Sequence, residues 1–295
     1  MQIHMRNVYD GRGEVKKAIQ PWLSGHSQRL DLLPGLQLLK QHLHSKSDVS
    51  VCEEAPSSLY FSFVGTGPIH SANDAQSLQI AYHPRRLNGS FDLPKGYQQS
   101  TLQICIRPSL LATVLGETEA QLVQHLIKMV ETLSNPRGII ELTLTKKSLQ
   151  LLGSVVSHKG HTISLTGHLY ALLFTLIEQL QQLNHLAQCD DCQRKVFHAQ
   201  NLLEIPINGA LNIKQLAQKV GLNSDTLAIG FAFVVGQSIE DYGTERRIKF
   251  AAAQLRQNPM AKPRILAESG FSEDEFEAAF IEHYGVSSQQ YKHIH

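Results

Sequence analysis

Two cysteines and two histidines lie close together in the segment NHLAQCDDCQRKVFH. His185 precedes Cys189 by one helical turn, and Cys189 and Cys192 form a C-x2-C pair. Two thiolates and two imidazoles are the ligands that Zn²⁺ prefers in a tetrahedral site. The spacing therefore predicts a metal site at His185, Cys189, Cys192 and His198. The alternatives are a redox-active cysteine pair, or two reduced cysteines and two surface histidines at the end of a helix.

No residue pattern in the sequence predicts catalysis. The chain contains no nucleophile elbow, no HExxH helix and no glycine-rich phosphate loop. Most of the 15 histidines are interpreted as solvated side chains. We therefore expect that the protein is not an enzyme, and we assign no catalytic residue.

Length and composition are typical of a globular chain with two domains. The 295 residues are 42% hydrophobic and 18% charged, with a formal net charge of +1. No apolar run approaches the roughly 20 residues that a membrane span needs, and the first residues do not form a signal-peptide pattern. Four cysteines are too few for a disulfide scaffold. We expect a cytoplasmic protein with no membrane partner.

One residue pattern occurs twice between positions 213 and 291, with the second copy 49 positions after the first. The paired positions are Gly221 and Gly270, Leu227 and Phe276, Phe231 and Phe280, Gly236 and Gly285, and Tyr242 and Tyr291. Such self-similarity at a fixed period indicates an internal repeat. Each copy predicts a helix, a glycine-containing turn and a second helix, the unit with which many proteins place one helix in a DNA groove.

Local signals predict where these helices begin and end. Gly221 can end a helix in a left-handed conformation, and Asn223 can cap the next helix. Ser272 and Glu275 predict a capping box at the same point of the second copy. The positions expected to face outward on the helix after Asn223 are Ser224, Asp225, Ala228, Ile229 and Ala232.

At these residues the chain resembles the AraC/XylS family of transcriptional regulators. The resemblance covers roughly the last 85 residues and depends on the strings LAQKVGLNSDTL, GQSIEDY and GFSEDEF. It implies two helix-turn-helix units joined by a long helix, here residues 239–257, which Pro259 would end. That helix would be about 27 Å long, and successive major-groove segments are about 34 Å apart.

The resemblance also implies which residues contact double-stranded DNA: Asn223, Ser224, Asp225, Thr226, Ala228, Ile229, Arg246, Arg247, Lys249, Arg264, Ser272, Glu273 and Asp274. The charge of this region departs from the family. From residue 201 onward nine Lys and Arg stand against eleven Asp and Glu, a formal charge of −2, whereas DNA binding normally relies on cations. The alternative is therefore an AraC-type interaction module, or a metal or redox sensor, with little DNA affinity.

The first half of the chain has a different pattern. Short β-rich runs occur at 59–64, 78–82, 101–106 and 139–144, separated by turn signals that include Asn88-Gly89. Helices are predicted at 108–115, 117–133, 146–156 and 165–188. The last carries an apolar stripe from Leu169 to Leu180 that would either form a dimer or pack within the chain.

These patterns predict an α+β protein with a β-barrel or cupin-like sensor domain followed by an all-α domain of two helix-turn-helix units. We divide the chain into an effector-sensing domain at 1–160, a dimerisation helix and linker at 161–200, and a DNA-binding domain at 201–295. The resemblance implies an effector-responsive regulator that forms a homodimer, with RNA polymerase as a further candidate partner. The sequence leaves open whether the protein is an activator or a repressor.

A second resemblance concerns the effector. The string RRLNGSFDLPKGYQQSTLQICIRPSLLATVLG is similar to the sensor domain of siderophore-responsive regulators of the pyochelin type. It implies an iron-siderophore or a similar small molecule as effector, and control of iron, siderophore or other metal-linked genes. The effector-binding residues stay unassigned, and zinc is the other candidate ligand.

Overall fold

The computed structural model describes residues 2–204, 212–258 and 262–291. Within these ranges the chain forms two compact units, Met1–Asn184 and His185–His295. The boundary lies inside one long helix, so the chain passes from the first unit to the second without a loop.

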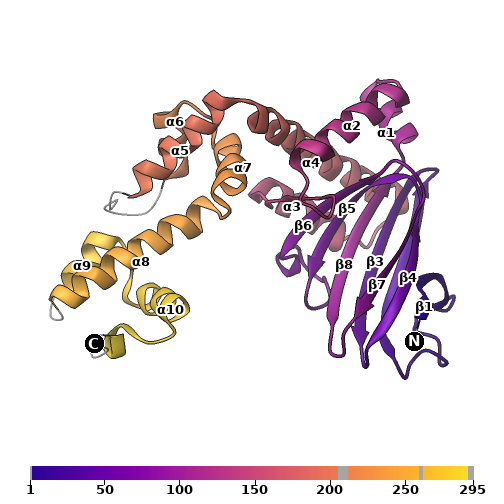
Figure 1. Ribbon diagram of the computed structural model, residues 1–295, viewed down its shortest axis with the longest axis horizontal. Coiled ribbons are helices and arrows are strands. Elements are labelled where there is room, and N and C mark those ends of the chain that lie inside the picture. Colours follow the sequence, from indigo (N-terminus) through magenta and orange to yellow (C-terminus); the bar gives the residue numbers. More distant parts are fainter. Residues whose placement is uncertain (1, 205–211, 259–261, 292–295) are drawn as a thin grey trace. The chain divides into compact units, whose positions relative to one another are not determined.

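The first unit contains two β-sheets (Figure 1). A six-stranded antiparallel sheet has the order β2-β3-β8-β5-β6-β9, and a three-stranded sheet has the order β1-β4-β7, in which β1 is parallel to β4. The strands are β1 (Gln2–His4), β2 (Leu23–Leu33), β3 (Leu36–Ser45), β4 (Val49–Ala55), β5 (Ser58–Gly65), β6 (Ser77–His83), β7 (Leu87–Leu93), β8 (Gln98–Ile106) and β9 (Ile139–Leu142).

Alternating apolar residues create the core of this unit. In β5, Phe61 and Phe63 are fully buried, and their partners across the strand pair with β8 are Ile104 and Leu102. A second cluster joins the three-stranded sheet to β2 and β3; its buried members are Ile3, Val8, Val15, Ile19, Leu23, Leu43, Val49, Val51 and Leu93. The β-rich runs predicted at 59–64, 78–82 and 101–106 lie within β5, β6 and β8.

The prediction of a turn at Asn88-Gly89 was wrong. Both residues lie inside β7, where Asn88 pairs with Glu54 and Gly89 with Glu53 of β4. The first six residues of β7 are exposed, so the strand lacks the alternation by which a half-buried strand is recognised. Its pairing with β4 decides its conformation, against the local turn preference of Asn-Gly.

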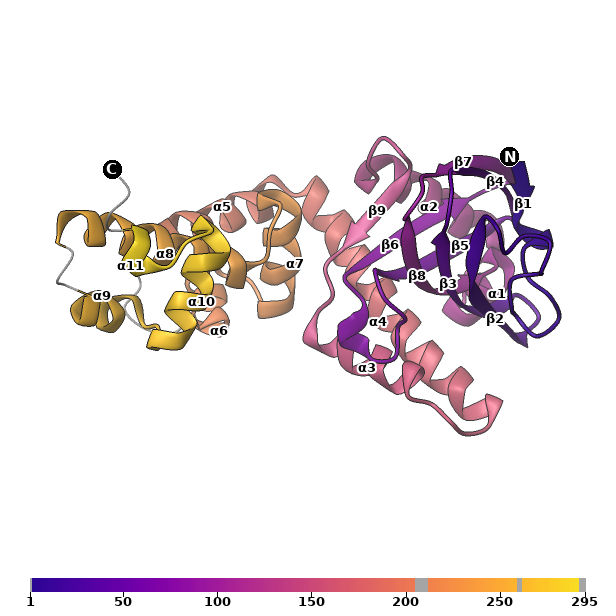
Figure 2. The same ribbon diagram turned by 90° about the horizontal axis from the view of Figure 1, so that it is seen from below.

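The helices of the first unit begin and end close to the predicted positions. They are α1 (Pro108–Leu115), α2 (Glu119–Leu133), α3 (Lys146–Val156) and α4 (Thr162–Gln188), with short 3-10 helices η1 (Met5–Asn7) and η2 (Ala72–Asp74). Gly116 ends α1 in a left-handed conformation, and Thr118 and Thr145 cap α2 and α3. Figure 2 shows α3 beside α4, where the Gln179 amide donates to Thr145 Oγ1 at 2.7 Å.

The apolar stripe of α4 is buried within the chain. Leu169, Leu172 and Leu176 have no exposed surface, and Leu180 is 2% exposed. In the part of the chain that the structure describes, α4 is the one helix long and apolar enough to cross a membrane by length and composition, a property that core helices share. Because the stripe is used for packing within the chain, a dimer would need a different surface.

The second unit is helical. It begins with the last residues of α4 and continues through α5 (Asp190–Glu204), α6 (Ile213–Val220), α7 (Ser224–Val235), α8 (Ile239–Gln257), α9 (Lys262–Ser269), α10 (Glu273–Tyr284) and α11 (Ser288–Tyr291). Residue 201, where we placed the start of the DNA-binding domain, lies inside α5, which packs on α6 and α7. Pro259 lies outside the described residues.

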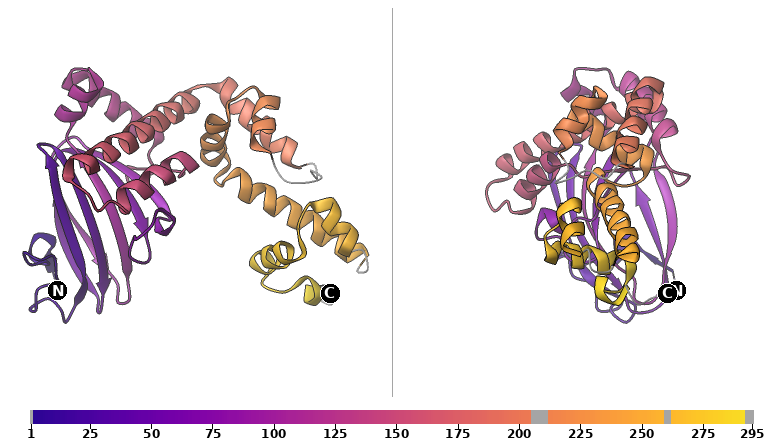
Figure 3. Two further views of the ribbon diagram at one scale, coloured as in Figure 1. Left: turned by 180° about the vertical axis from the view of Figure 1, so that it is seen from behind. Right: turned by 90° about the vertical axis from the view of Figure 1, so that its left-hand side faces the viewer.

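Two separate apolar clusters hold this unit together. The first consists of Leu186, Val196, Ala199, Leu203, Leu216, Ala217, Val220, Leu227, Phe231, Ile239 and Tyr242. The second consists of Ile248, Ala251, Ala252, Leu255, Ile265, Phe276, Phe280 and Tyr291. Helix α8 contributes to both clusters and connects the α6–α7 pair to the α9–α10 pair (Figure 3).

Candidate functional site

The sequence repeat is also a structural repeat. Gly221 and Gly270 end α6 and α9 at φ values of 70° and 69°, a conformation that favours glycine. Gly236 and Gly285 have φ values of 85° and 72° at the ends of α7 and α10. Both glycines of each copy therefore adopt the left-handed backbone conformation.

A ring contact repeats in the same way. Phe231 meets Tyr242 edge-on with ring centroids 5.4 Å apart, and Phe280 meets Tyr291 edge-on at 5.1 Å. All four rings are buried. This contact joins the second helix of each pair to the helix that follows it, so the two pairs share one internal architecture.

The N-terminal end of α7 presents polar groups to solvent. The Asn223 side chain caps the helix by accepting a hydrogen bond from the backbone N–H of Thr226 at 2.7 Å. Asn223 and Asp225 are exposed, whereas Ser224, Thr226 and Ala228 are partly exposed. These residues are the predicted DNA contacts that remain accessible in the first pair.

Ile229 was expected to face outward, and the structure buries it. Its side chain is 3% exposed. The reason is the composition of α7, in which Leu227, Gly230 and Phe231 are buried as well; a helix that is apolar on every side is buried on more than one side. Ile229 is therefore not accessible to DNA in this structure.

The second pair has an acidic N-terminal end. Ser272 Oγ accepts from the backbone N–H of Glu275, and a Glu275 carboxylate oxygen accepts from the Ser272 N–H at 3.0 Å. The Ser272 hydroxyl, at 2.7 Å, and the Ser272 N–H both donate to this carboxylate, and these two hydrogen bonds hold the pKa of Glu275 below its ordinary value. Ser272, Glu273 and Asp274 are exposed. The capping box is confirmed, and it uses one of the four clustered carboxylates to stabilise the helix.

The basic residues of α8 that were expected to support DNA binding are engaged within the unit. Arg246 stacks over the Tyr242 ring at 4.9 Å and pairs with Glu204 at 2.6 Å. Arg247 stacks over Phe271 at 4.2 Å, and burial lowers its pKa. Each of these guanidinium groups therefore joins two elements of the unit.

Three further cations of the second unit, Lys249, Lys262 and Arg264, are paired with carboxylates. Lys249 forms an ion pair with Glu245, and Arg264 pairs with Glu268 at 2.6 Å. Lys262 contacts Glu273 at 2.9 Å and Glu277 at 2.7 Å. A carboxylate beside each cation reduces the positive potential that phosphate would meet.

Two lysines that the sequence reasoning passed over are free of this pairing. Lys214 and Lys219 lie on α6, are exposed, and form no ion pair with any described residue. The presence of two lysines five positions apart on one predicted helix was the feature of the sequence that could have marked them as phosphate contacts. Lys219 places unpaired positive charge beside the α6–α7 turn, and Lys214 places it in the first turn of α6.

Three of the four predicted metal ligands come together. The ligand atoms of His185, Cys189 and Cys192 all lie within 4.8 Å of one another, and Cys192 Sγ is 3.9 Å from His185 Nε2. His198 is exposed farther along α5 and does not belong to this group. The structure therefore assembles a three-residue set of two sulfurs and one nitrogen.

The two thiols of this set differ. A hydrogen bond from the Cys192 thiol, together with the backbone N–H of Cys192 at 3.2 Å, lowers the pKa of Cys189. The same thiol contact raises the pKa of Cys192. Asp191, between the two cysteines, forms ion pairs with Lys195 at 2.8 Å and with Arg194 at 3.4 Å.

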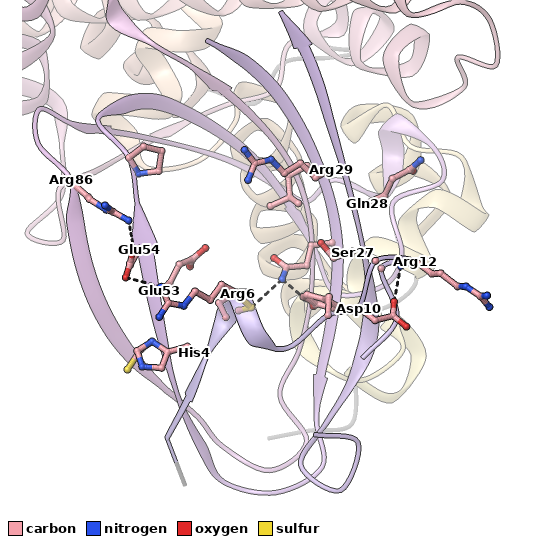
Figure 4. Close-up of a pocket in the computed structure, with 18 of the residues that line it drawn as sticks. His4, Arg6, Asp10, Arg12, Ser27, Gln28, Arg29, Glu53, Glu54 and Arg86 are labelled. Carbon is pink, nitrogen blue, oxygen red and sulfur yellow. Dashed lines mark hydrogen bonds and ion pairs between the residues drawn. The ribbon is translucent and has the colours of Figure 1, made fainter. Parts of the chain in front are cut away.

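A pocket of about 880 Å³ opens in the first unit between β2, β4 and the N-terminal segment. The residues that line it include four arginines, Arg6, Arg12, Arg29 and Arg86, and three acidic residues, Asp10, Glu53 and Glu54 (Figure 4). Arg6 and Arg86 both pair with Glu54.

Three other residues of this pocket, Arg29, Tyr9 and Glu53, have polar groups that could bind a ligand. Arg29 pairs only with exposed Asp31, at 3.3 Å, among the described residues. Tyr9 accepts a hydrogen bond from the Gln41 amide at 3.0 Å. Surrounding protein raises the pKa of Glu53, although its side chain still reaches solvent in the open pocket. A polar ligand with an acidic group would find partners here.

No protein-family model and no curated protein matches the chain. Among solved structures, it is similar to a transcriptional regulator with an AraC-type DNA-binding domain from Chromobacterium violaceum (24% identity, 34% of this chain and 91% of the other, TM-score 0.32). It is also similar to the C-terminal domain of AraT, a response regulator from Geobacillus stearothermophilus (22%, 34% and 84%, TM-score 0.30). A third is ToxT from Vibrio cholerae bound to an unsaturated fatty acid (12%, 89% and 96%, TM-score 0.29). At these scores the likenesses do not establish a shared function.

Proposed function

We propose that this chain is an effector-responsive transcription regulator of the AraC type that binds double-stranded DNA with its second unit. The observation that carries the proposal is the duplicated helix pair: left-handed glycines at the same positions, a side-chain cap at the start of the second helix and an edge-on ring contact occur in both copies. Two equivalent helix pairs on one connecting helix suit two successive segments of a major groove.

The first pair is the principal reader in this proposal. Asn223, Asp225 and Thr226 stand at the N-terminal end of α7, where polar side chains can reach base edges. Lys214 and Lys219 supply charge for phosphate contacts on the adjoining helix. The second pair contributes less, because the carboxylates at the start of α10 repel phosphate.

The pocket of the first unit is the proposed effector site. Its arginines favour a small molecule that carries an acidic group. An iron-loaded siderophore is the class that the sequence resemblance suggests, and the regulated genes would then serve iron or other metal supply. Binding would shift the population of DNA-competent arrangements. Contact with RNA polymerase, dimer formation and a cytoplasmic location belong to the same proposal.

The test of DNA binding is a titration of the full chain against its own upstream DNA over a range of salt concentrations. For each phosphate contact, the slope of log K against log salt should steepen by about 0.9. Replacing both α6 lysines by alanine should weaken binding and flatten that slope by about 1.8. A matched double variant, Lys128→Ala with Lys159→Ala in the first unit, should leave the slope unchanged.

The test of the effector site uses Arg29→Ala, with Arg137→Ala as the control for an exposed arginine outside the pocket. Ferric siderophores and free siderophores would be screened for a rise in melting temperature. We expect a ligand that stabilises the parent chain and the control but not the pocket variant. Equal stabilisation of both variants would place the effector elsewhere.

A second candidate function is an interaction module with little DNA affinity. The pairing of Arg246, Lys249, Lys262 and Arg264 with carboxylates favours it. Absence of specific, salt-dependent binding to any fragment of the upstream DNA, with and without the effector, would support this second candidate over the first.

A further inference from the structure

We propose that His185, Cys189 and Cys192 bind a divalent metal ion, with zinc as the physiological ion. The metal would hold in place the α4–α5 corner, the short bend at Cys189 between α4 and α5, which packs against α7. The site does not depend on DNA binding, so it can be tested whether or not the proposed function holds.

The geometry of the three donor atoms matches zinc coordination. With Zn–S bonds of about 2.3 Å and Zn–N bonds of about 2.0–2.1 Å, tetrahedral angles place sulfur about 3.6 Å from nitrogen. The observed separation between Cys192 Sγ and His185 Nε2 is 3.9 Å. All three atoms lie within 4.8 Å of one another, so closing the widest separation by up to about 1 Å brings them to one ion.

The chain brings these donors together by a short change of direction between two helices. Cys189 is the residue between α4, which ends at Gln188, and α5, which starts at Asp190. The Gln193 side chain bridges the corner, donating to the carbonyls of Leu186 at 3.3 Å and Ala187 at 3.0 Å. Helix-terminal hydrogen bonds therefore hold the backbone that carries the ligands in place before metal binds.

The chemistry of the set favours zinc over magnesium or calcium. Two thiolates and one imidazole are soft to borderline donors, which suit zinc. Magnesium and calcium are hard cations that prefer oxygen ligands. Three protein ligands leave a fourth position for water or for an exchangeable ligand. A site of this kind can gain and lose metal, which is what a regulatory site requires.

Packing connects the site to the proposed reading helix. Cys192 contacts the apolar cluster that contains Leu227 and Phe231 of α7. Gly230 of α7 lies so close to the corner that a Cβ atom there would be 2.3 Å from Leu186 Cδ1. Movement of the α4–α5 corner would therefore displace α7 or open a gap in its core.

The experiment measures metal content and cobalt spectra on the reduced full chain. We expect about one zinc per chain by elemental analysis, and a thiolate-to-cobalt charge-transfer band when Co²⁺ replaces zinc. Cys189→Ser and His185→Ala should each lower the retained zinc at least tenfold after dialysis against a mild chelator. Cys52→Ser and His198→Ala are the matched controls and should retain it.

Folding and coupling need separate readouts. Circular dichroism tests whether each variant is folded. Cys189→Ser is preferred to a Cys192 variant, because Cys192 packs on the apolar core and its replacement would also disturb packing. Hydrogen exchange in α5 and α7 should slow on zinc addition in the parent chain and not in Cys189→Ser. Retention of zinc by the Cys189→Ser or His185→Ala variant would overturn the proposal, as would reduced parent chain that binds no zinc or cobalt.

Discussion

Truncation of Phe280 to alanine should unfold one half of the second unit and leave the other half intact. Phe280 is fully buried, and its ring centroid lies 5.3 Å from that of Phe276, 4.8 Å from Tyr284 and 5.1 Å from Tyr291. Among the described rings of this cluster, only Phe280 and Tyr284 have three aromatic neighbours. Phe280 is therefore central to the packing of α10 and α11.

The expected cost is large relative to the stability of a small domain. Removing a buried phenylalanine typically costs about 3–5 kcal/mol, through lost burial and the cavity left behind. Three aromatic contacts of about 0.5–1.5 kcal/mol each agree with that range. A domain is usually stable by about 5–15 kcal/mol, so the change removes much of the stability of the cluster around α9 and α10.

The assay is native-state hydrogen exchange read by mass spectrometry. Because Phe280 contributes to only one of the two apolar clusters, exchange should accelerate in α9, α10 and the second half of α8. Peptides from α5, α6 and α7 should keep their protection. Ile281→Ala is the matched control: this neighbour is 48% exposed, and its truncation should cost less than about 1 kcal/mol.

Equal loss of protection in both clusters would refute this reasoning. It would mean that the second unit unfolds as one cooperative body through α8, despite its two separate cores. An unchanged exchange pattern in α9 and α10 would contradict the burial of Phe280 itself.

Three further predictions concern the turns, the ion pairs and the response to pH. Gly221→Ala should lower the free energy of unfolding by about 1–2 kcal/mol because its φ is 70°, and not through a clash, since the nearest atom to a new Cβ is 4.0 Å away. Chemical denaturation measures this change. Asn tolerates the left-handed conformation better than Ala, so an equal cost for Gly221→Asn would argue against backbone strain. Arg246→Ala should lower the free energy of unfolding by about 1 kcal/mol through loss of ring stacking and of the ion pair with Glu204. A double-mutant cycle with Glu204→Gln should isolate the coupling energy of the pair. Additive effects of the two changes would show that the pair contributes nothing. Burial alone would raise the pKa of Glu277, but hydrogen bonds from Lys262 and Ser288 lower it below 4.5, so its contribution is present above that value and is lost as pH falls through the lowered pKa. Melting temperatures of Glu277→Gln should therefore fall less steeply with acidification than those of the parent chain, and parallel curves would exclude this role.

Local signals in the sequence were sufficient to locate most helices. Residues 108–115, 146–156 and 239–257 were predicted as helices and form α1, α3 and α8 with the same first and last residues. The repeat at a spacing of 49 predicted two helix pairs, and the structure repeats their caps and glycine conformations. Caps, left-handed glycines and helical periodicity act over a few residues, so a sequence displays them directly.

The tertiary structure decided which of those residues are available for function. Ile229 is buried, and Asn88-Gly89 forms part of a strand because β4 pairs with it. His198 lies apart from the other three predicted metal ligands. Each outcome depends on what another segment places nearby, which spacing along one element does not determine.

The same division holds for charge. The sequence determined that the second unit carries an excess of carboxylates, and that α10 begins with several of them. Only the fold showed that Arg246 and Lys262 are bound to Glu204 and Glu277, and that Lys219 is not paired with any described carboxylate. An ion pair forms over a few ångströms between elements that can be far apart in the chain, so its partners are set by packing and not by sequence order.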